Sequence, residues 1–328
     1  MILAGDIGGT NARIATFAVA GGRLKLGIEH VYPTHQYPNL ESALREFLKG
    51  GIEQPAAACF GIAGPVRNGR AEMPNLGWVV DATSLAKEVG IERVAILNDL
   101  EANAYGVASL EDSDFVVLNA GAEDASGNAA VVSAGTGLGE AGLYFDGRTW
   151  RPFACEGGHA DFAPADELQT EMVVWLRKQF GHVSWERVLS GQGILNIYRF
   201  LRESGRAQEE PWLVDALKSG DPAATIVKAA IEKKSALCEM TLQIFISAYG
   251  AEAANLALKI MATGGIFIGG GIAPRILSLL TGPAFMNAFV RKGRMGELLE
   301  RIPVKVILND STALIGAARA AALSAGLI

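Results

Sequence analysis

One glycine-rich segment near the start of the chain combines bare backbone with polar side chains suited to phosphate. Residues 5–13 read Gly-Asp-Ile-Gly-Gly-Thr-Asn-Ala-Arg and stand between two apolar runs that predict strands. Glycines let a phosphate approach the backbone amides, Thr10 and Asn11 add donors, and Arg13 adds a cation. A Rossmann turn is excluded because no helix follows directly, and the Gly-Lys-Ser/Thr ending of a P-loop is missing. We predict that this segment cradles a polyphosphate and that Asp6 holds Mg²⁺ through water.

Two further glycine turns occur later in the chain. Residues 133–139 read Ser-Ala-Gly-Thr-Gly-Leu-Gly and follow a predicted strand, and two opposed turns of this kind can clamp one phosphate chain. Residues 269–274 read Gly-Gly-Gly-Ile-Ala-Pro, where bare backbone suits a flat adenine ring. Taken alone, this third turn is equally well explained as a turn before a helix.

Asn98 and Asp99 follow an apolar run that predicts a buried strand, and they precede residues that predict a helix. A carboxylate at this position can accept a proton from an attacking hydroxyl, as a general base does. Asn and Asp are also ordinary helix N-caps. Asp310 has the same local context, so the pattern alone does not choose between the two aspartates.

Residues 156–162 read Glu-Gly-Gly-His-Ala-Asp-Phe and place two acids and an imidazole around two glycines. This spacing suits the recognition of several hydroxyls of a small polyol, so we predict that His159 is a ligand and not a core residue. A metal site is disfavoured because no second His or Cys lies at ligand spacing. Glu186 could add a further carboxylate, although alone it is typical of a solvated helix.

Short apolar runs and glycines indicate the elements that position these groups. An order of strand, strand, strand, helix, strand and helix predicts a mixed sheet with helices on its faces. Ala95–Asp99 and its alanine-rich helix recur as Val306–Asp310 and Ala313–Ala322. We interpret this repeat as two duplicated halves that face each other across a cleft. The long apolar helix Ala236–Met261 is predicted to lie in the core or at a subunit interface.

The composition limits the class of protein. The chain has 328 residues and a net charge of −6, which argues against a nucleic-acid partner. Its three cysteines are far apart, as in proteins with reduced thiols. A membrane span is not expected because no continuous apolar stretch of about 20 residues is present. No basic segment precedes the first apolar run, so we predict a cytoplasmic protein.

Together these motifs resemble those of bacterial glucokinases of the non-ROK type, within the actin/hexokinase/Hsp70 superfamily. The resemblance spans nearly the whole chain, in seven short motifs: residues 5–13, 75–78, 97–99, 133–139, 156–162, 186–191 and 269–274. It implies a two-domain α/β fold of the actin-like ATPase (ribonuclease H-like) type, with mixed five-stranded sheets flanked by helices and an active-site cleft between domains. The implied domains are 1–109 plus 302–328, the smaller, and 110–301, the larger.

The resemblance also implies roles for individual residues. It assigns the general base to Asp99, which leaves Asp310 structural. The implied glucose ligands are Asn75, Asn98, Asp99, Glu156, His159 and Glu186. The implied ATP ligands are Gly5, Asp6, Ile7, Gly8, Gly9, Thr10, Asn11, Arg13, Gly135, Thr136, Gly137, Gly269, Gly270 and Gly271. Related ROK kinases carry a zinc-binding cysteine cluster after their Glu-x-Gly-His motif, and zinc is not expected here because this chain has no such cluster.

The expected activity is ATP-dependent phosphorylation of D-glucose to glucose 6-phosphate, feeding glycolysis, by a homodimer. One alternative is a kinase of another hexose, such as mannose, fructose or glucosamine. A second is a sensor that binds sugar and ATP without transferring phosphate, although a sensor has no need of a base such as Asp99. A third is an actin-like filament protein, against which residues 156–162 count.

Overall fold

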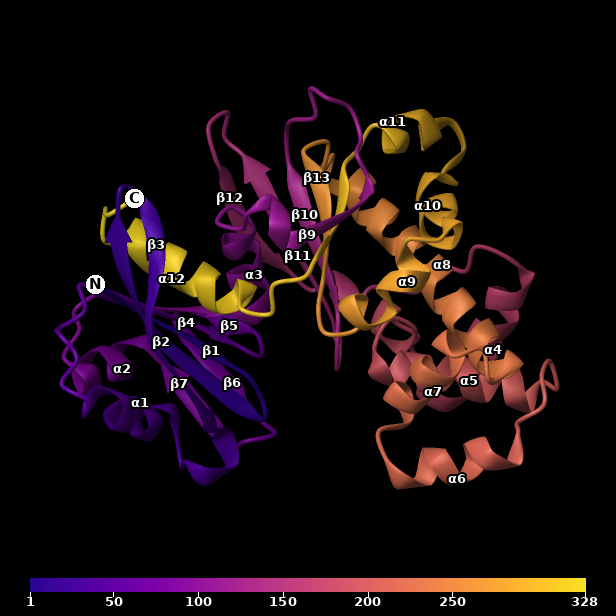
Figure 1. Ribbon diagram of the computed structural model, residues 1–328, viewed down its shortest axis with the longest axis horizontal. Coiled ribbons are helices and arrows are strands. Elements are labelled where there is room, and N and C mark those ends of the chain that lie inside the picture. Colours follow the sequence, from indigo (N-terminus) through magenta and orange to yellow (C-terminus); the bar gives the residue numbers. More distant parts are fainter. The chain divides into compact units, whose positions relative to one another are not determined.

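The computed structural model describes all residues from 1 to 328 and contains two compact units (Figure 1). Unit 1 comprises residues 1–112, 151–154 and 309–328, and unit 2 comprises residues 113–150 and 155–308. The sequence placed the return to the first domain at residue 302. Strand β14 (Val304–Ile307) instead pairs with β13 (Gly265–Gly269) inside unit 2, so the chain re-enters unit 1 only at residue 309.

Unit 1 is built on a five-stranded mixed sheet with the order β3-β2-β1-β4-β8. Its strands are β1 (Ile2–Ile7), β2 (Asn11–Ala20), β3 (Arg23–Pro33), β4 (Ala57–Ile62) and β8 (Val94–Asn98). Strands β1, β2 and β3 form an antiparallel meander, whereas β4 and β8 run parallel to β1. The carboxyl ends of β1, β4 and β8 therefore meet at one edge, which is where open α/β sheets place their ligands.

Both faces of this sheet are covered because its central strands are apolar on both sides. On β1, Leu3 packs in the cluster that contains residues of α1 (Leu40–Leu48) and α2 (Ala82–Val89). Its neighbours Ile2 and Ala4 pack with α12 (Thr312–Ser324), since successive side chains of a strand point to opposite faces. Unit 1 also contains a three-stranded sheet that the sequence did not predict: β5 (Val66–Arg67), β6 (Arg70–Met73) and β7 (Trp78–Asp81).

Helix α3 (Asp99–Val107) packs against α12 through two glycines. A Cβ at Gly316 would lie 1.7 Å from the carbonyl oxygen of Ala102, and a Cβ at Gly106 would lie 2.1 Å from that of Thr312. Neither position has room for a side chain. Backbone contact with α12 thus sets the position of α3, and with it that of Asp99 in the first turn of the helix.

Unit 2 contains a six-stranded sheet with the order β12-β11-β10-β13-β14-β9, one strand more than the sequence predicted. Its other strands are β9 (Phe115–Asn119), β10 (Ala129–Ala134), β11 (Leu138–Phe145) and β12 (Trp150–Cys155). Strand β10 is antiparallel to β11 and parallel to β13, which is parallel to β14. The order β11-β10-β13-β14 repeats that of β2-β1-β4-β8, in keeping with duplicated halves. The additional strand β9 pairs antiparallel with β14 at the edge.

The helices of unit 2 are α4 (Glu167–Phe180), α5 (Gly191–Glu203), α6 (Pro211–Ser219), α7 (Pro222–Ile231), α8 (Ala236–Ile260), α9 (Leu277–Leu280), α10 (Pro283–Val290) and α11 (Gly296–Glu300). Helix α8 lies in the core. The hydroxyl of its Tyr249 lies 3.1 Å from the carbonyl oxygen of Val132 and accepts a hydrogen bond from the amide of Ala134 at 3.2 Å. Of the two positions predicted for this helix, the structure therefore shows the interior, where α8 fixes the end of β10.

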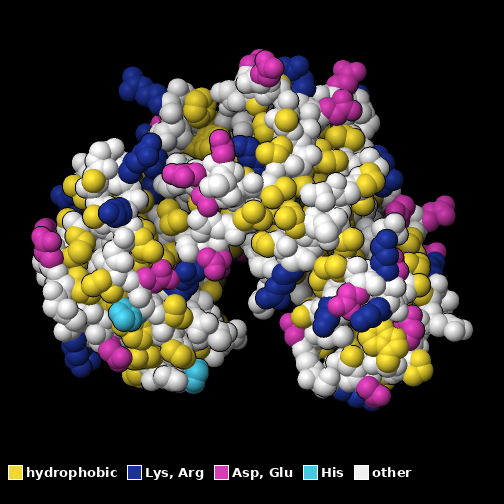
Figure 2. Space-filling model, viewed as in Figure 1, with side chains coloured by type: hydrophobic (Ala, Val, Ile, Leu, Met, Phe, Trp, Pro, Cys, Tyr) yellow, Lys and Arg dark blue, Asp and Glu magenta, His cyan; other side chains and the backbone are white.

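The surface carries charges of both signs. On the face drawn in Figure 2, Lys and Arg side chains are interspersed with Asp and Glu over both units. None of the helices combines the length and the hydropathy that a bilayer span requires.

Candidate active site

The first glycine turn connects β1 to β2 and leaves its backbone open. The amide of Gly8 donates to the carbonyl of Asn11, and the Oγ1 of Thr34 donates to the carbonyl of Gly9, both at 2.9 Å. A Cβ at Gly9 would meet no atom within 4 Å, and the neighbouring Thr10 is exposed. The turn therefore presents backbone and polar side chains to solvent, as phosphate-binding turns do.

Two other residues of the predicted ATP set lie inside the sheet. A Cβ at Gly5 would lie 2.6 Å from Cδ1 of Phe60, so only glycine admits this ring. Ile7 is fully buried in the core of unit 1. Gly5 and Ile7 therefore belong to the packed sheet on which the turn stands.

Asp6 and Arg13 are paired in register where β1 and β2 meet the turn. Burial raises the pKa of the Asp6 carboxyl, and the positive charge of Arg13 opposes that shift. Mg²⁺ commonly takes one or two protein carboxylates, and waters and phosphate oxygens complete its shell. Asp6 fits this requirement as a single hard oxygen donor.

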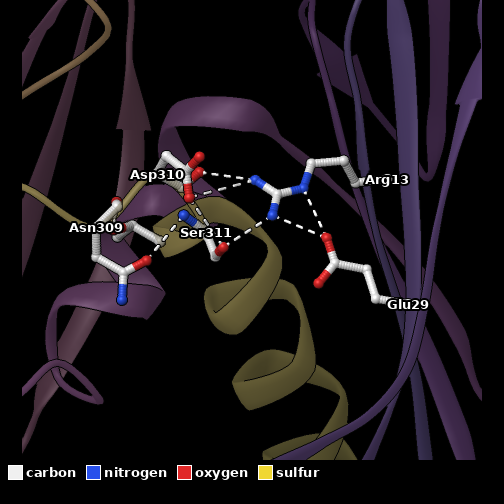
Figure 3. Close-up of polar contacts among 6 residues, drawn as sticks. Arg13, Glu29, Asn309, Asp310 and Ser311 are labelled. Carbon is white, nitrogen blue, oxygen red and sulfur yellow. Dashed lines mark hydrogen bonds and ion pairs between the residues drawn. The ribbon is translucent and has the colours of Figure 1, made fainter.

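Arg13 belongs to a polar network that joins β2 and β3 to the start of α12 (Figure 3). Its Nε and Nη2 donate to Oε1 of Glu29 at 3.0 and 2.8 Å. Nη2 also donates to Oγ of Ser311 at 2.9 Å, and Nη1 donates to the carbonyl of Asp310 at 3.2 Å. The side chain of Arg13 is only 23 % exposed. The cation predicted for phosphate is thus already engaged by protein groups, and a phosphate would have to share it.

Asn98 and Asp99 lie at the carboxyl edge of the unit 1 sheet. Asn98 caps α3, since its Oδ1 accepts from the amide of Leu100 at 2.9 Å and its Nδ2 donates to the carbonyl of Gly64 at 3.0 Å. It is in register with Ile62 at the end of β4. Asp99 is half-buried, and its Oδ1 lies 3.0 Å from the same amide. Unit 1 therefore brings both to the edge at which β1 ends.

Asn75 is the remaining predicted glucose ligand of unit 1. It lies in the exposed turn between β6 and β7, in the small sheet, and not at the edge of the main sheet.

In unit 2, residues 156–162, here called the Glu156 loop, are joined to residues 183–186 by main-chain hydrogen bonds. The amide of Trp185 donates to the carbonyl of Ala160 at 3.0 Å. The rings of Trp185 and Phe162 meet edge to face, with their centroids 4.7 Å apart. Two segments that are separate in sequence thus form one continuous surface.

Glu186 connects this surface to the second glycine turn. Its Oε2 accepts from the amide of Leu138 at 3.1 Å, and a Cβ at Gly137 would lie 2.5 Å from the same oxygen. The side chains of Glu156 and His159 are 66 % and 62 % exposed and lie 3.9 Å apart. The structure therefore brings together the three predicted polyol ligands of unit 2.

A cavity of about 840 Å³ also opens at the second glycine turn. Gly135 and Thr136 line it, together with the start of α5, most of α7 and the segment after β13. Its volume lies in the range of about 300–1,000 Å³ that is usual for small-molecule sites. The wall combines apolar side chains such as Ile194 and Ile272 with the cations Lys228 and Arg275, and it also contains Asp221 and Glu232. Apolar surface and cations together suit a flat ring attached to an anionic chain.

The triple-glycine turn contributes one of its three glycines to this cavity, Gly271. Gly269 is the end of β13, and Gly270 adopts φ +83°. A Cβ at Gly270 would lie 2.2 Å from the carbonyl oxygen of Ala134. These two glycines therefore shape the turn that exposes Gly271.

Helix α7 forms one wall of this cavity and was not predicted from the sequence. Asp221 caps the helix by accepting from the amides of Ala223 and Ala224 at 2.9 and 3.3 Å, and Pro222 occupies the first turn. An Asp followed by Pro is a recognised helix start and could have located it. Ala223, Ala224 and Lys228 all line the cavity.

Comparison with known proteins identifies the family. The family described as Glucokinase matches residues 3–324. The chain belongs to the glucokinase family. A glucokinase from Trichormus variabilis is 43 % identical over 338 residues, which cover 98 % of this chain and 99 % of that protein. The family predicted from the motifs is thereby confirmed.

Solved structures agree with this assignment. The crystal structure of a glucokinase from an Antarctic psychrotroph has 33 % sequence identity and a TM-score of 0.86, and the match covers 98 % of both chains. A ROK-family glucokinase from Streptomyces griseus, solved with glucose and AMPPNP, has the same fold with a TM-score of 0.62 at 21 % identity, covering 98 % of this chain and 99 % of that one. The chain has the two-domain, mixed α/β fold of these sugar kinases.

Proposed function

We propose that this chain transfers the γ-phosphoryl group of ATP to O6 of D-glucose. The observation that carries the proposal is the shared position of the second glycine turn. Gly135 and Thr136 line the cavity suited to a nucleotide, while Gly137 and Leu138 contact Glu186, a predicted glucose ligand. Phosphoryl transfer requires adjacent donor and acceptor, and one turn that serves both sites meets that requirement. The Streptomyces griseus enzyme was solved with glucose and AMPPNP, which supports a sugar and a nucleotide as the two ligands of this chain.

The nucleotide would bind with its base against α7 and Gly271 and with its phosphates at the second glycine turn. The first glycine turn, from Gly8 to Asn11, would supply further phosphate donors. Asp6 would hold Mg²⁺ through water, and that ion, when bound, supplies positive charge for the phosphate oxygens.

Glucose would be held by carboxylate and imidazole groups that read its hydroxyls. Glu156, His159 and Glu186 would supply these contacts from unit 2, and Asn75 and Asn98 would add amide groups. Asp99 would accept the proton of O6 as this oxygen attacks phosphorus.

Release of ADP from Mg-ATP tests the proposed activity. We expect strong stimulation by glucose in a coupled assay and weaker stimulation by mannose, fructose and glucosamine. A different preferred hexose would keep the chemistry and change the substrate. Binding of ATP and glucose without ADP release would contradict phosphoryl transfer and favour the sensor.

Filling the cavity tests its assignment to ATP. Ala224→Trp would place an indole ring in the cavity, so we expect the KM for ATP to rise by about tenfold or more and glucose binding to change by less than about twofold. Thr225→Trp, on the same helix but outside the cavity wall, is the matched control. Titration calorimetry with AMPPNP measures the effect directly. An unchanged affinity in Ala224→Trp would show that the nucleotide binds elsewhere.

A homodimer in the cytoplasm is the assembly that the family resemblance suggests. Sedimentation velocity tests it, with a species of twice the mass of the chain as the expected result. A single species of the monomer mass would contradict it.

A further inference from the structure

Two carboxyl groups are buried together inside unit 2, and neither has a role in the proposed reaction. Glu140 on β11 is 1 % exposed, and Glu252 on α8 is fully buried. The Oε1 atom of each has no hydrogen-bond partner. Two ionised carboxylates in contact would repel each other without water to solvate them, so one of the pair must carry a proton.

The surrounding groups place that proton on Glu140. Nζ of Lys259 lies 3.6 Å from Oε1 of Glu252, and Nδ2 of Asn255 donates to Oε2 of Glu252 at 2.7 Å. Lys292, just after α10, donates to Oδ1 of Asn255 at 2.6 Å and adds positive charge near Glu252. The ion pair and the hydrogen bond thus stabilise the ionised form of Glu252. Burial beside this second carboxyl raises the pKa of Glu140 to about 8.

The positive charge of Lys259 also lowers the pKa of Glu140, but by less than burial and Glu252 each raise it. Tyr249 from α8 and Cys155 from β12 also face Glu140, and burial raises the pKa of both groups, which keeps them neutral.

The carboxyl of Glu140 lies directly beneath the Glu156 loop. A Cβ at Gly157 would lie 1.8 Å from Oε2 of Glu140, so the carboxyl fills the space where a side chain would be. The next residue, Gly158, packs equally closely on β11, since a Cβ there would lie 2.1 Å from the carbonyl oxygen of Leu138. The loop backbone therefore rests on β11 at two successive glycines, and the three atoms nearest to a Cβ at Gly157 all belong to Glu140.

We propose that Glu140 is a positioning residue for sugar binding, holding Glu156 and His159 in place through its contact with Gly157. The proposal rests on the proposed function, because it takes Glu156 and His159 as glucose ligands. A neutral carboxyl fills the space under the loop and remains bound to Glu252. An ionised carboxylate repels Glu252 and draws in water, which displaces the loop.

The expected pH dependence has a definite sign. A carboxyl whose pKa is raised to about 8 is neutral below that pH and ionised above it. Glucose affinity should therefore be constant near neutral pH and fall as the pH rises through about 8. The KM for ATP should stay constant over this pH range, because the Glu156 loop does not line the nucleotide cavity.

The kinetic test compares wild type with Glu140→Gln and Glu140→Ala between about pH 6.5 and 9.5. In wild type we expect the KM for glucose to rise about tenfold at the alkaline end, since displacement of ligands by about 1 Å has effects of up to about 10²-fold. The Gln side chain of Glu140→Gln is neutral at every pH and has the same shape, so the KM of this variant for glucose should not change with pH. Glu140→Ala empties the space under Gly157 and should raise the KM for glucose about tenfold at all pH values, with kcat changed less.

Glu239→Gln is the matched control, an acid-to-amide change at an exposed position of α8, and it should follow wild type. An alkaline rise in Glu140→Gln equal to that of wild type would overturn the proposal. So would a wild-type KM for glucose that does not change with pH.

Hydrogen exchange separates this proposal from the proposed function. Amides of the Glu156 loop should exchange faster in wild type at about pH 9 than at about pH 7, after correction for intrinsic rates, and Glu140→Gln should show no such difference. This comparison needs no turnover, so it decides the role of Glu140 even if glucose is not the substrate. Equal protection in both proteins at both pH values would overturn it.

Discussion

Replacing Asp99 by Asn is expected to lower kcat by about 10²–10⁴-fold while glucose affinity changes by less than about threefold. The amide has the same size, and its Oδ1 can still accept from the Leu100 amide, as Asp99 does at 3.0 Å. It cannot accept a proton from O6 of the sugar. Steady-state kinetics with both substrates, together with calorimetric binding of glucose, separates the loss of a base from the loss of a ligand.

Asp310→Asn is the matched control for this prediction. Asp310 follows the same Leu-Asn sequence as Asp99 but is exposed, and its carboxylate lies 3.7 Å from Nη1 of Arg13. A surface ion pair of this kind contributes at most about 1 kcal/mol, so kcat should stay within about fivefold of wild type. If Asp99→Asn turned over at the wild-type rate, Asp99 would not be the general base. A large loss in Asp310→Asn instead would point to the other aspartate.

Gly316→Ala is expected to destabilise the protein by about 2 kcal/mol, the upper end of the usual cost of overpacking less the gain in helix propensity. The new Cβ would lie 1.7 Å from the carbonyl oxygen of Ala102 and 2.6 Å from the amide nitrogen of Gly106. Both are backbone atoms, so the contact is relieved only if α3 and α12 move apart. Overpacking of this kind costs about 1–3 kcal/mol and occasionally more, and the higher helix propensity of alanine offsets only about 1 kcal/mol of it.

Urea unfolding followed by circular dichroism measures this loss. Because α3 begins at Asp99, the folded variant should also lose turnover, measured per mole of folded protein at low urea. Gly220→Ala is the control, since a Cβ there would meet no atom within 4 Å and the backbone has φ −157°. A Gly316→Ala variant as stable as Gly220→Ala would mean that the two helices do not pack at this glycine.

The sequence predicted the elements whose patterns are strong and local. The buried strands of both sheets and helix α8 were found because their apolar runs are long. Helix α7 was missed although Asp221 and Pro222 mark its start, and this miss hid one wall of the cavity. The small sheet of β5 to β7 was missed because such short strands alternate only briefly.

The remaining features depend on contacts between distant residues. The sequence predicts Arg13 to be a phosphate ligand, and only the structure shows that Arg13 donates hydrogen bonds to Glu29 and Ser311. Glu140 stands in a strand where an acid is normally expected to face solvent, and only the structure shows that it is buried beside Glu252 from α8. The domain boundary was placed before β14 because local sequence does not reveal that this strand pairs with β13.

Helix α12 comes after all of unit 2 in the sequence, yet it covers one face of the unit 1 sheet, where Leu314 and Ala318 pack in one cluster with Ile2 and Ala4. During synthesis the strands of unit 1 therefore leave the ribosome first, while that face stays bare until residues 113–308 have been added. At about 5–20 residues per second this interval lasts roughly 10–40 s. Unit 2 has all its own residues at Leu308, before α12 has been added. The part of the enzyme made first is thus completed last, and one apolar face of its sheet stays uncovered until α12 has been made.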